Sequence, residues 1–500
     1  MATPTKRPCV VRDASTAVAR LNGAVLIDML QMIPNARDAL AFLNAWPSTA
    51  LPPSLVALKE LSGVMSLTTQ WPSLVLQTIP TDHMELGVSA LPAFPQIQVS
   101  DMTDARCLAA ALPRTVRVKL STSSMWTDAT HAVVRAWHDH ITDLSFRKPS
   151  DMPEAVVDAL RQCTHLRNVS IVDPINATVA QQIVAAVTTR SLQQLDLDVM
   201  FKDPLDTTDM AAWLRRGGAT TLRLACTGVT DATALADAIY SCDSLASLSL
   251  VGARSVVDAL LASPRPLHQL SELSLDVRGA AQNDTALLHK LSGAKMTSLT
   301  LIGRIIDAPP GIWKPLMSFT KLQQLTLQRI SLLDVSASGT CPQLRSVTLR
   351  ELAMQAKDIP KVTKWLGTSM SLRSLEWADM KLGRQGLTAL AQAVPHWMTH
   401  GLETLSLQSI PIDADGAKRL AASLQQGRNP SPLRIALSNS QLLRGSVQQL
   451  ANAIDACRQV TLGLFSSHSR KYKLEIAAGL GQPDVDAGDV IFVQMASPPA

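Results

Sequence analysis

A six-residue phrase, Leu-x-x-Leu-x-Leu, recurs along most of this chain and strongly limits what the chain can fold into. It reads Leu-Gln-Gln-Leu-Asp-Leu at 192–197 and Leu-Gln-Gln-Leu-Thr-Leu at 322–327. Consecutive copies are about 26 residues apart, and a period of that length is typical of a stacked repeat protein. The first apolar positions of the clearest copies are Ile141, Leu166, Leu192, Ala219, Leu245, Leu270, Met296, Leu322, Leu344, Leu372, Leu402, Pro432 and Cys457.

Weaker copies precede these, at 71–76, 94–99 and 113–118. Apolar residues alternate within each copy, which predicts a short strand. Between copies the apolar period changes to 3.6, which predicts a helix, most clearly within 230–239, 386–394, 416–424 and 446–454. Thr230 or Asp231 is the candidate N-cap of the first of these helices. The sequence therefore predicts roughly sixteen strand–turn–helix repeats.

A single repeat of this kind cannot be stable alone. Each offers three apolar strand side chains and three or four from its helix, worth about 1.5–3 kcal/mol apiece when buried. Ordering the residues of one repeat costs about 1.5 kcal/mol for each of them. Stacking buries both faces of every repeat, so only the array folds. We expect a solenoid over roughly 65–463, with parallel strands inside and helices outside.

Two segments, LRLACTGVTDATALADAIYSCDSLASLSL (222–250) and LETLSLQSIPIDADGAKRLAASL (402–424), resemble the helix-bearing leucine-rich repeats of the ribonuclease-inhibitor-like class. The resemblance implies an α/β fold, with a parallel inner sheet and outer helices. The chain departs from the class at the eighth position after the first Leu, which is usually Asn or Cys. Here that position is Met380 or Ile410, for example. We therefore expect an apolar core position there, and no ladder of side-chain hydrogen bonds in the turns.

The segment 21–62 lacks the repeat phrase and predicts a small all-α domain. Its first helix ends at Pro34, Asn35 caps a second helix that Pro47 stops, and a third, shorter helix follows. Such helices can simply cap the first repeat. The expected organisation is a flexible N-terminus (1–20), the helical domain (21–62), irregular leading repeats (65–140), the main array (141–463) and a C-terminal cap and tail (464–500).

The same segment also resembles an F-box. Val25-Leu26, Leu30, Ile33-Pro34, Asp38 and Leu40 match the F-box pattern, whereas its opening Leu-Pro is Leu21-Asn22 here. The combination with WPSL at 71–74 is similar to F-box-like repeat proteins of oomycetes. An F-box tethers a substrate to a cullin–RING ubiquitin ligase through an adaptor subunit, and the repeats select the substrate. The adaptor-binding residues that this resemblance implies are Val25, Leu26, Met29, Leu30, Ile33 and Pro34.

The inner face of the predicted sheet is rich in hydroxyl groups, since fourteen of the twenty-four positions that alternate with the strand leucines from Leu166 onward are Ser or Thr. Glu272, Asp276 and Arg434 have no opposite charge at the equivalent position of the next strand. Arg350 and Glu376 are diagonal neighbours that can neutralise each other. The face could be a purely structural surface. As a binding surface, its predicted partner-binding residues are Glu272, Asp276, Arg350, Glu376 and Arg434.

Several function classes find no support in the sequence. Nucleotide-binding, serine-hydrolase and zinc-protease motifs are missing, so we expect no enzyme activity and no cofactor. His138 and His140 flank Asp139 without a third ligand, so we expect a surface turn and no metal site. A net charge of +5 is small for 500 residues, so we expect no nucleic-acid partner. No apolar run approaches the roughly 20 residues of a membrane span.

The seven cysteines are dispersed and never spaced as C-x-x-C, which indicates a reducing compartment, cytoplasmic or nuclear. Cys163, Cys242 and Cys341 each precede a first Leu by three residues and are expected to be packing residues. Two functional hypotheses follow. One is a substrate receptor of a cullin–RING ubiquitin ligase that binds an adaptor subunit and an unknown protein substrate. The other is a repeat scaffold or regulator with no link to ubiquitin.

Overall fold

The computed structural model divides into two compact units, Met1–Met200 (unit 1) and Phe201–Ala500 (unit 2), which are described separately. The predicted N-terminal segment 1–20 lies outside the described residues. The structure describes every residue except 1–22, 101–104, 123–125, 148–152, 189–191, 200–203, 277–283, 304–311, 333–334, 336–338, 439–443, 456, 458–459, 466–472, 479–490 and 494–500.

Unit 1 begins with the small helical region that the sequence predicted. Its elements are α2 (Gly23–Gln31), α3 (Ala36–Asn44), η1 (Ser48–Ala50), α4 (Pro53–Leu61) and α5 (Leu67–Gln70). The side chain of Asn35 accepts a hydrogen bond from the backbone N of Asp38 at 2.8 Å, and so caps α3 as expected. Leu55, Leu58 and Leu61 on α4 are fully buried. Helix α4 packs on α6 (Met84–Ala90) and η4 (Leu91–Ala93), which belong to the first repeats.

Among the described residues of unit 1, the sheet has six parallel strands in sequence order. They are β1 (Ser73–Val75), β2 (Gln96–Ser100), β3 (Arg117–Ser121), β4 (Ile141–Phe146), β5 (Asn168–Ile175) and β6 (Gln194–Val199). The connections contain η2 (Leu76–Thr78), η3 (Thr81–His83), α6, η4, η5 (Ala105–Ala109), α7 (Asp128–Trp137), α8 (Pro153–Gln162) and α9 (Ala177–Val187). Strands β1 and β2 begin at the third residue of the weak repeat phrases at 71–76 and 94–99, whereas β3 begins two residues later in the phrase at 113–118.

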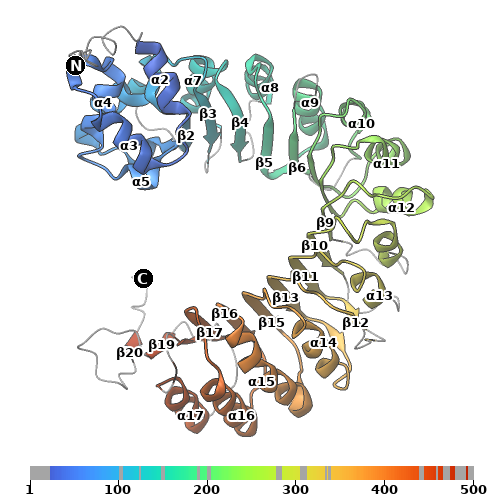
Figure 1. Ribbon diagram of the computed structural model, residues 1–500. Coiled ribbons are helices and arrows are strands. Elements are labelled where there is room, and N and C mark those ends of the chain that lie inside the picture. Colours follow the sequence, from blue (N-terminus) through green and yellow to red (C-terminus); the bar gives the residue numbers. More distant parts are fainter. Residues whose placement is uncertain are drawn as a thin grey trace, which may run out of the picture. The chain divides into compact units, whose positions relative to one another are not determined.

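Within the part of unit 2 that the structure describes, the pattern continues with ten parallel strands, again in sequence order (Figure 1). The six strands of unit 1 and these ten agree with the sixteen repeats that the sequence predicts. The strands are β7 (Thr221–Ala225), β8 (Ser247–Val251), β9 (Glu272–Asp276), β10 (Ser298–Ile302), β11 (Gln324–Gln328), β13 (Ser346–Arg350), β15 (Ser374–Ala378), β16 (Thr404–Gln408), β17 (Leu433–Ser438) and β18 (Val460–Phe465).

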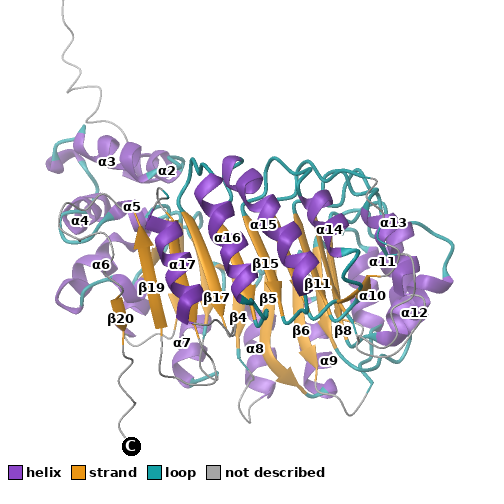
Figure 2. Cartoon of the chain, turned by 90° about the horizontal axis from the view of Figure 1, so that it is seen from below, coloured by secondary structure: helices purple, strands orange, loops and turns teal. Residues whose placement is uncertain are grey.

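Helices cover one face of the unit 2 strands, as α14 to α17 show in Figure 2. Asp231 accepts a hydrogen bond from the backbone N of Ala234 at 2.8 Å, so it is the N-cap of the first predicted helix. The helices of eight or more residues are α10 (Thr208–Arg215), α11 (Ala232–Ser241), α12 (Arg254–Ala262), α14 (Ile359–Leu366), α15 (Gly383–Thr399), α16 (Ala414–Gln426) and α17 (Arg444–Asp455). These helices alternate along the chain with the parallel strands, which confirms the predicted α/β fold class.

The expectation of an α-helix in every repeat is wrong for the middle of unit 2, within the residues that the structure describes. There the connections contain η6 (Asp284–Lys290), the single-turn α13 (Trp313–Leu316), and β12 (Ser331–Leu332) paired with β14 (Ala353–Met354). The interval from Leu322 to Leu344 is only 22 residues. So short a repeat leaves too little chain for a helix, and a two-residue strand closes its outer side instead.

Burial follows the predicted alternation. Leu299 and Leu301 on β10 are buried, while Ser298 and Thr300, which alternate with them, are half-buried. Met380 and Ile410, which replace the usual Asn or Cys in the turns, are 4% and 0% exposed. The predicted apolar core position is thereby confirmed. At the C-terminal end, β19 (Lys473–Ala478) pairs antiparallel with β18, and β20 (Ile491–Val493) pairs with β19, which ends the parallel series.

Candidate functional site

The strand face opposite the helices, here called the open face, is polar and mostly uncharged in unit 2. One row across it consists of hydroxyl side chains that are direct neighbours in the strand register, and all of them are half-buried. None of the large hydrophobic residues that are exposed in the described part of the chain lies on these strands. The open face thus offers hydrogen-bonding groups to a partner. The row is Ser249, Ser274, Thr300, Thr326 and Thr348.

Arg350, one of the predicted partner-binding residues, is held by side chains of the next two strands. Its Nη2 donates to Glu376 Oε1 at 3.3 Å and to Gln408 Oε1 at 2.5 Å. Its Nε lies 3.8 Å from Asp379 Oδ2. The predicted neutralisation of Arg350 by Glu376 is confirmed. Arg350 stays a candidate for partner contacts, since its side chain is 35% exposed beside these neighbours.

A column of non-glycine residues with positive φ follows the ends of four adjacent strands. Arg329, Glu351, Asp379 and Ser409 have φ between 50° and 55°. The ladder of backbone hydrogen bonds extends into this column, since Arg329 N donates to Arg350 O at 3.0 Å and Glu351 N donates to Ala378 O at 2.9 Å. Side chains other than Gly, Asn and Asp seldom adopt this left-handed conformation. No glycine marks these four positions, so sequence rules for turns do not indicate the column.

Two members of the column form an ion pair, with Arg329 Nε 2.9 Å from Glu351 Oε2. The hydrogen bond from Arg329 is the main cause that lowers the pKa of Glu351, and burial partly opposes it. Gln328 and Arg350 lower the same pKa by smaller amounts. Glu351 therefore keeps its charge at every pH near neutrality.

The remaining predicted partner-binding residues differ in their exposure. Glu272 on β9 and Arg434 on β17 are exposed. Asp276, on the same strand as Glu272, is only 5% exposed. The expectation that Asp276 contacts a partner is corrected, because its carboxylate lies inside the protein. Glu272 and Arg434 stay candidates for partner contacts.

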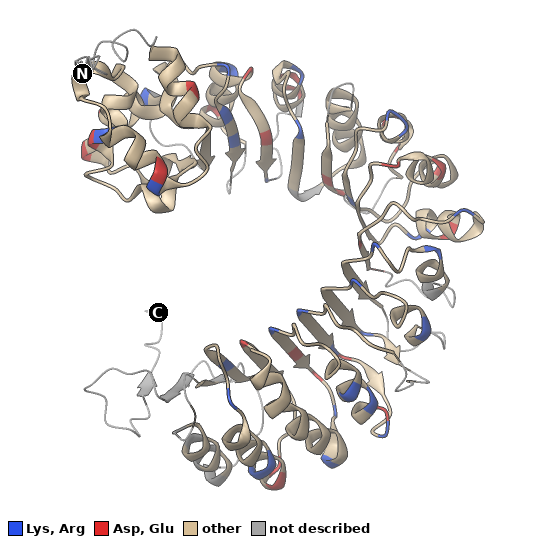
Figure 3. Ribbon diagram, viewed as in Figure 1, with Lys and Arg blue, Asp and Glu red and all other residues tan. Residues whose placement is uncertain are grey.

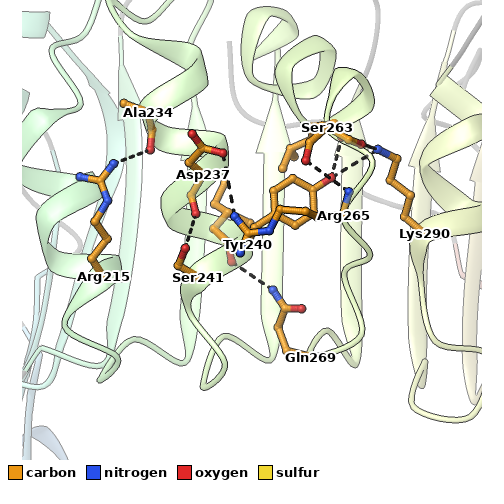
Figure 4. Close-up of polar contacts among 11 residues, drawn as sticks. Arg215, Ala234, Asp237, Tyr240, Ser241, Ser263, Arg265, Gln269 and Lys290 are labelled. Atoms are coloured by element: carbon orange, nitrogen blue, oxygen red, sulfur yellow. Dashed lines mark hydrogen bonds and ion pairs between the residues drawn. The ribbon is translucent and has the colours of Figure 1, made fainter.

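A second polar cluster joins α11, α12 and η6 on the helix side of unit 2 (Figure 4). Lys290 Nζ donates to the backbone O of Leu260 at 2.8 Å, of Leu261 at 3.0 Å and of Ser263. Tyr240 Oη donates to the same Leu260 O at 2.6 Å. Burial raises the pKa of Tyr240 and lowers that of Lys290. The ammonium group neutralises the carbonyl end of α12, so this cluster is a structural clamp.

Helix α2 carries the predicted adaptor-binding residues on two different sides. Leu26 and Leu30 are 1% and 0% exposed, whereas Val25 and Met29 are 41% and 44% exposed. Met32, which continues the Val25–Met29 stripe, is 82% exposed. Leu26 and Leu30 are thus unavailable to an adaptor, and this part of the prediction is corrected. The exposed stripe consists of Val25, Met29 and Met32.

The end of α2 is fixed to the first repeats by hydrogen bonds. Trp71 Nε1 donates to the backbone O of Ile33 at 2.8 Å. Gln31 Nε2 donates to the backbone O of Pro92 at 3.0 Å and of Phe94 at 3.3 Å. Ile33 is half-buried, and Pro34 next to it is exposed. These contacts hold α2 in one orientation without using its exposed stripe.

The cysteines in the described part of the chain are packing residues. Cys163, Cys242 and Cys341 are at most 2% exposed, as the sequence predicted. The Cys341 thiol donates to the backbone O of Trp365 at 3.2 Å, and burial raises its pKa to about 11. Burial raises the pKa of Cys226 to about 11 as well. Such thiols are poor nucleophiles and poor metal ligands.

The two histidines around Asp139 lie in a turn and contact backbone oxygens. His138 Nδ1 is 3.2 Å from Arg135 O, and His140 Nδ1 is 3.1 Å from Val116 O. Among the described residues, no three His, Cys, Asp or Glu side chains converge as a metal site would require. In the same part of the chain, no helix combines the length and apolar character needed to cross a bilayer.

Comparison with known proteins gives structural similarity without sequence similarity. Neither the known protein-family models nor the sequences of curated proteins match this chain. An internalin from Listeria monocytogenes is 14% identical over 77% of this chain and 89% of its own, with a TM-score of 0.33. The crystal structure of a Rad7 and Elc1 complex in yeast contains a chain that is 12% identical, over 86% of this chain and 85% of its own, with a TM-score of 0.34.

Proposed function

We propose that this protein is an interaction module that captures a protein on its repeats and docks, through α2, on the adaptor subunit of a cullin–RING ubiquitin ligase. The observation that carries the proposal is the exposed stripe of Val25, Met29 and Met32. These residues have the spacing i, i+4, i+7, which puts them on one side of a helix. A helix that lays such a stripe into a partner's groove is a recurrent mode of protein recognition.

The fold itself does not need this stripe. Leu26 and Leu30 supply the buried side of α2, and the hydrogen bonds at Gln31 and Ile33 fix its end. Large apolar side chains gathered on a surface cost solubility and are typical of binding sites. Two of the five large hydrophobic residues that are exposed in the described chain lie on α2, and a third, Met32, lies in the turn directly after it, which favours a docking role over that of a plain cap.

The test is retention of a purified ligase adaptor by the full chain. We expect the wild type to retain the adaptor, and the double variant Met29→Asp, Met32→Asp to lose it, because a charge at either position cannot enter an apolar groove. Val64→Asp is the matched control, since Val64 is 42% exposed, apolar and outside α2. It should retain the adaptor. Circular dichroism of all three proteins checks that they are folded.

Two results would contradict the ligase link. In one, the folded wild type retains no adaptor. In the other, the double variant retains as much as the wild type. Either would leave the second hypothesis, a repeat scaffold or regulator with no connection to ubiquitin. Capture of a protein partner by the repeats is tested independently below.

A further inference from the structure

The turns that lead into four consecutive strands of unit 2 each carry one basic residue. Lys295 precedes β10, Lys321 precedes β11, Arg345 precedes β13 and Arg373 precedes β15. All four side chains are exposed. Figure 3 shows basic residues recurring from repeat to repeat in this part of unit 2. We call these four residues the basic strip.

The strand register places the four residues of the basic strip at the starts of neighbouring strands, with an offset of two residues between the two lysines and the two arginines. Ser298, Gln324, Ser346 and Ser374 are direct neighbours across β10, β11, β13 and β15, and each follows its basic residue by one or three positions. Parallel strands are about 4.8 Å apart, so the strip extends over about 14 Å, the length of four or five extended residues. Backbone N of Arg373 donates to Arg345 O at 2.8 Å, which fixes the spacing of the two arginines.

Carboxylates are missing from the immediate surroundings in sequence. The segments 291–298, 317–324, 339–346 and 367–374, which contain the basic strip, include no Asp or Glu. Glu403 lies directly before β16, the next strand, and its Oε1 is 3.8 Å from Arg373 Nε. Arg373 Nη1 also donates to the backbone O of His400 at 2.9 Å and of Gly401 at 2.5 Å. Arg373 is therefore held in place at one end of the strip.

An exposed apolar side chain accompanies the strip. Met370 precedes Arg373 by three residues and is 59% exposed, the second most exposed large hydrophobic residue in the described chain. Methionine adapts its shape to different apolar partners, and exposed methionines are frequent at binding surfaces. The strip thus combines a row of positive charges with one apolar contact point.

We propose that the basic strip binds an acidic, extended segment of a partner protein, with an apolar residue of that segment on Met370. Carboxylates are the complementary charge, and alternate side chains of an extended peptide point to the same side. A single-stranded nucleic acid fits less well, because its bases stack on aromatic side chains and none is among the exposed large hydrophobic residues that the structure describes. The proposal rests on the proposed function, since it identifies the kind of protein that the repeats capture.

The test is fluorescence anisotropy of a labelled peptide of alternating glutamate and glycine with one central leucine, titrated with the full chain. We expect saturable binding that weakens as salt is raised. The double variant Lys321→Gln, Arg345→Gln should weaken binding about fivefold to tenfold, because each exposed charge pair contributes a modest factor. Lys364→Gln with Lys418→Gln, two exposed lysines on α14 and α16, is the matched control and should bind as the wild type does.

The apolar contact has its own measurement. Met370→Ser should weaken binding of the peptide with the central leucine. It should not change binding of an otherwise identical peptide that has serine in place of the leucine. If Met370→Ser weakens binding of both peptides equally, Met370 is not the apolar contact and that part of the proposal fails.

Three results would overturn the assignment of the strip itself. The first is that the acidic peptide does not bind. The second is that the control pair weakens peptide binding as much as Lys321→Gln, Arg345→Gln does. The third is that a single-stranded oligonucleotide binds more tightly than the peptide and that Lys321→Gln, Arg345→Gln weakens its binding too. The last result would assign the strip to nucleic acid. Met29→Asp with Met32→Asp should bind the peptide normally. Failure of the adaptor test and failure of this proposal are therefore distinguishable.

Discussion

At the scale of single residues, the column of positive-φ residues (Arg329, Glu351, Asp379 and Ser409) is the feature that simple sequence rules explain least. Each non-glycine residue in this conformation costs about 1–2 kcal/mol. Gly252, in the equivalent place after β8, has φ of 71° and meets the same backbone requirement without that cost. Arg329 and Glu351 recover part of the cost through their ion pair. A surface ion pair is worth up to about 1 kcal/mol, so the compensation is incomplete.

Replacing Ser409 by glycine should therefore stabilise the protein. Relief of the left-handed strain is partly offset by the extra freedom that glycine gives the unfolded chain, which leaves a gain of about 0.5–1 kcal/mol. Arg329→Gly makes the same backbone change but removes the ion pair with Glu351, so its net effect should be close to zero. Urea denaturation of the two variants and the wild type measures both. A loss of stability in Ser409→Gly would show that its side chain stabilises the turn.

The ion pair of Arg329 and Glu351 also predicts a pH dependence. The pKa of Glu351 is lower in the folded protein than its unfolded value of about 4.3. Its contribution is therefore complete above that unfolded value and is lost as the pH falls through the folded pKa. Glu351→Gln should unfold at a lower temperature than the wild type at pH 7, by an amount equivalent to no more than about 1 kcal/mol. The difference should vanish in strong acid, and a difference that persists there would assign it to packing.

At the scale of elements, α2 shows how far sequence patterns reach. The sequence resolved two apolar stripes on this helix, but both satisfy the same 3.6-residue periodicity. Only the packing of α2 on the first repeats decides that Leu26 and Leu30 face inward while Val25 and Met29 face outward. Extending the outer stripe by one turn would have found Met32.

The two stripes of α2 should respond differently to truncation. Leu30→Ala should destabilise unit 1 by about 2–5 kcal/mol, because it leaves a cavity in a fully buried site. Met29→Ala, at a site that is 44% exposed, should change the stability by less than about 0.5 kcal/mol. Thermal unfolding of the full chain followed by circular dichroism compares them. Equal losses in the two variants would mean that Met29 also packs against the protein, and that the docking stripe is misassigned.

At the scale of the whole molecule, the repeat phrase carries most of the information. Sixteen strands were predicted from about sixteen phrases, because each Leu-x-x-Leu-x-Leu places its leucines in the core whatever fills the gaps. The charge pattern carried less. Arg350 and Glu376 were identified as neighbours, yet Asp379 and Gln408 also hold Arg350, and their contribution depends on how the turns after the strands are shaped.

The basic strip was missed for a related reason. Its members occupy two different positions in the repeat phrase. Lys295 and Lys321 directly precede the first apolar residue of the phrase, whereas Arg345 and Arg373 directly follow it. A count over fixed positions on the strands passes over both. They form one row only because the strand register brings these turns side by side.

By itself, the sequence determined the repeat architecture, the parallel strands, the cap at Asn35, the choice of Thr230 or Asp231 as a second cap, and the burial of Cys163, Cys242 and Cys341. These features depend on local periodicity and side-chain chemistry, which can be read within one or two repeats. The tertiary structure alone decided which side of α2 is exposed, that Asp276 is buried, that Gln408 and Asp379 also contact Arg350, and that four basic residues form a row. These features depend on contacts between segments some 26 residues or more apart in the chain, which periodicity does not specify.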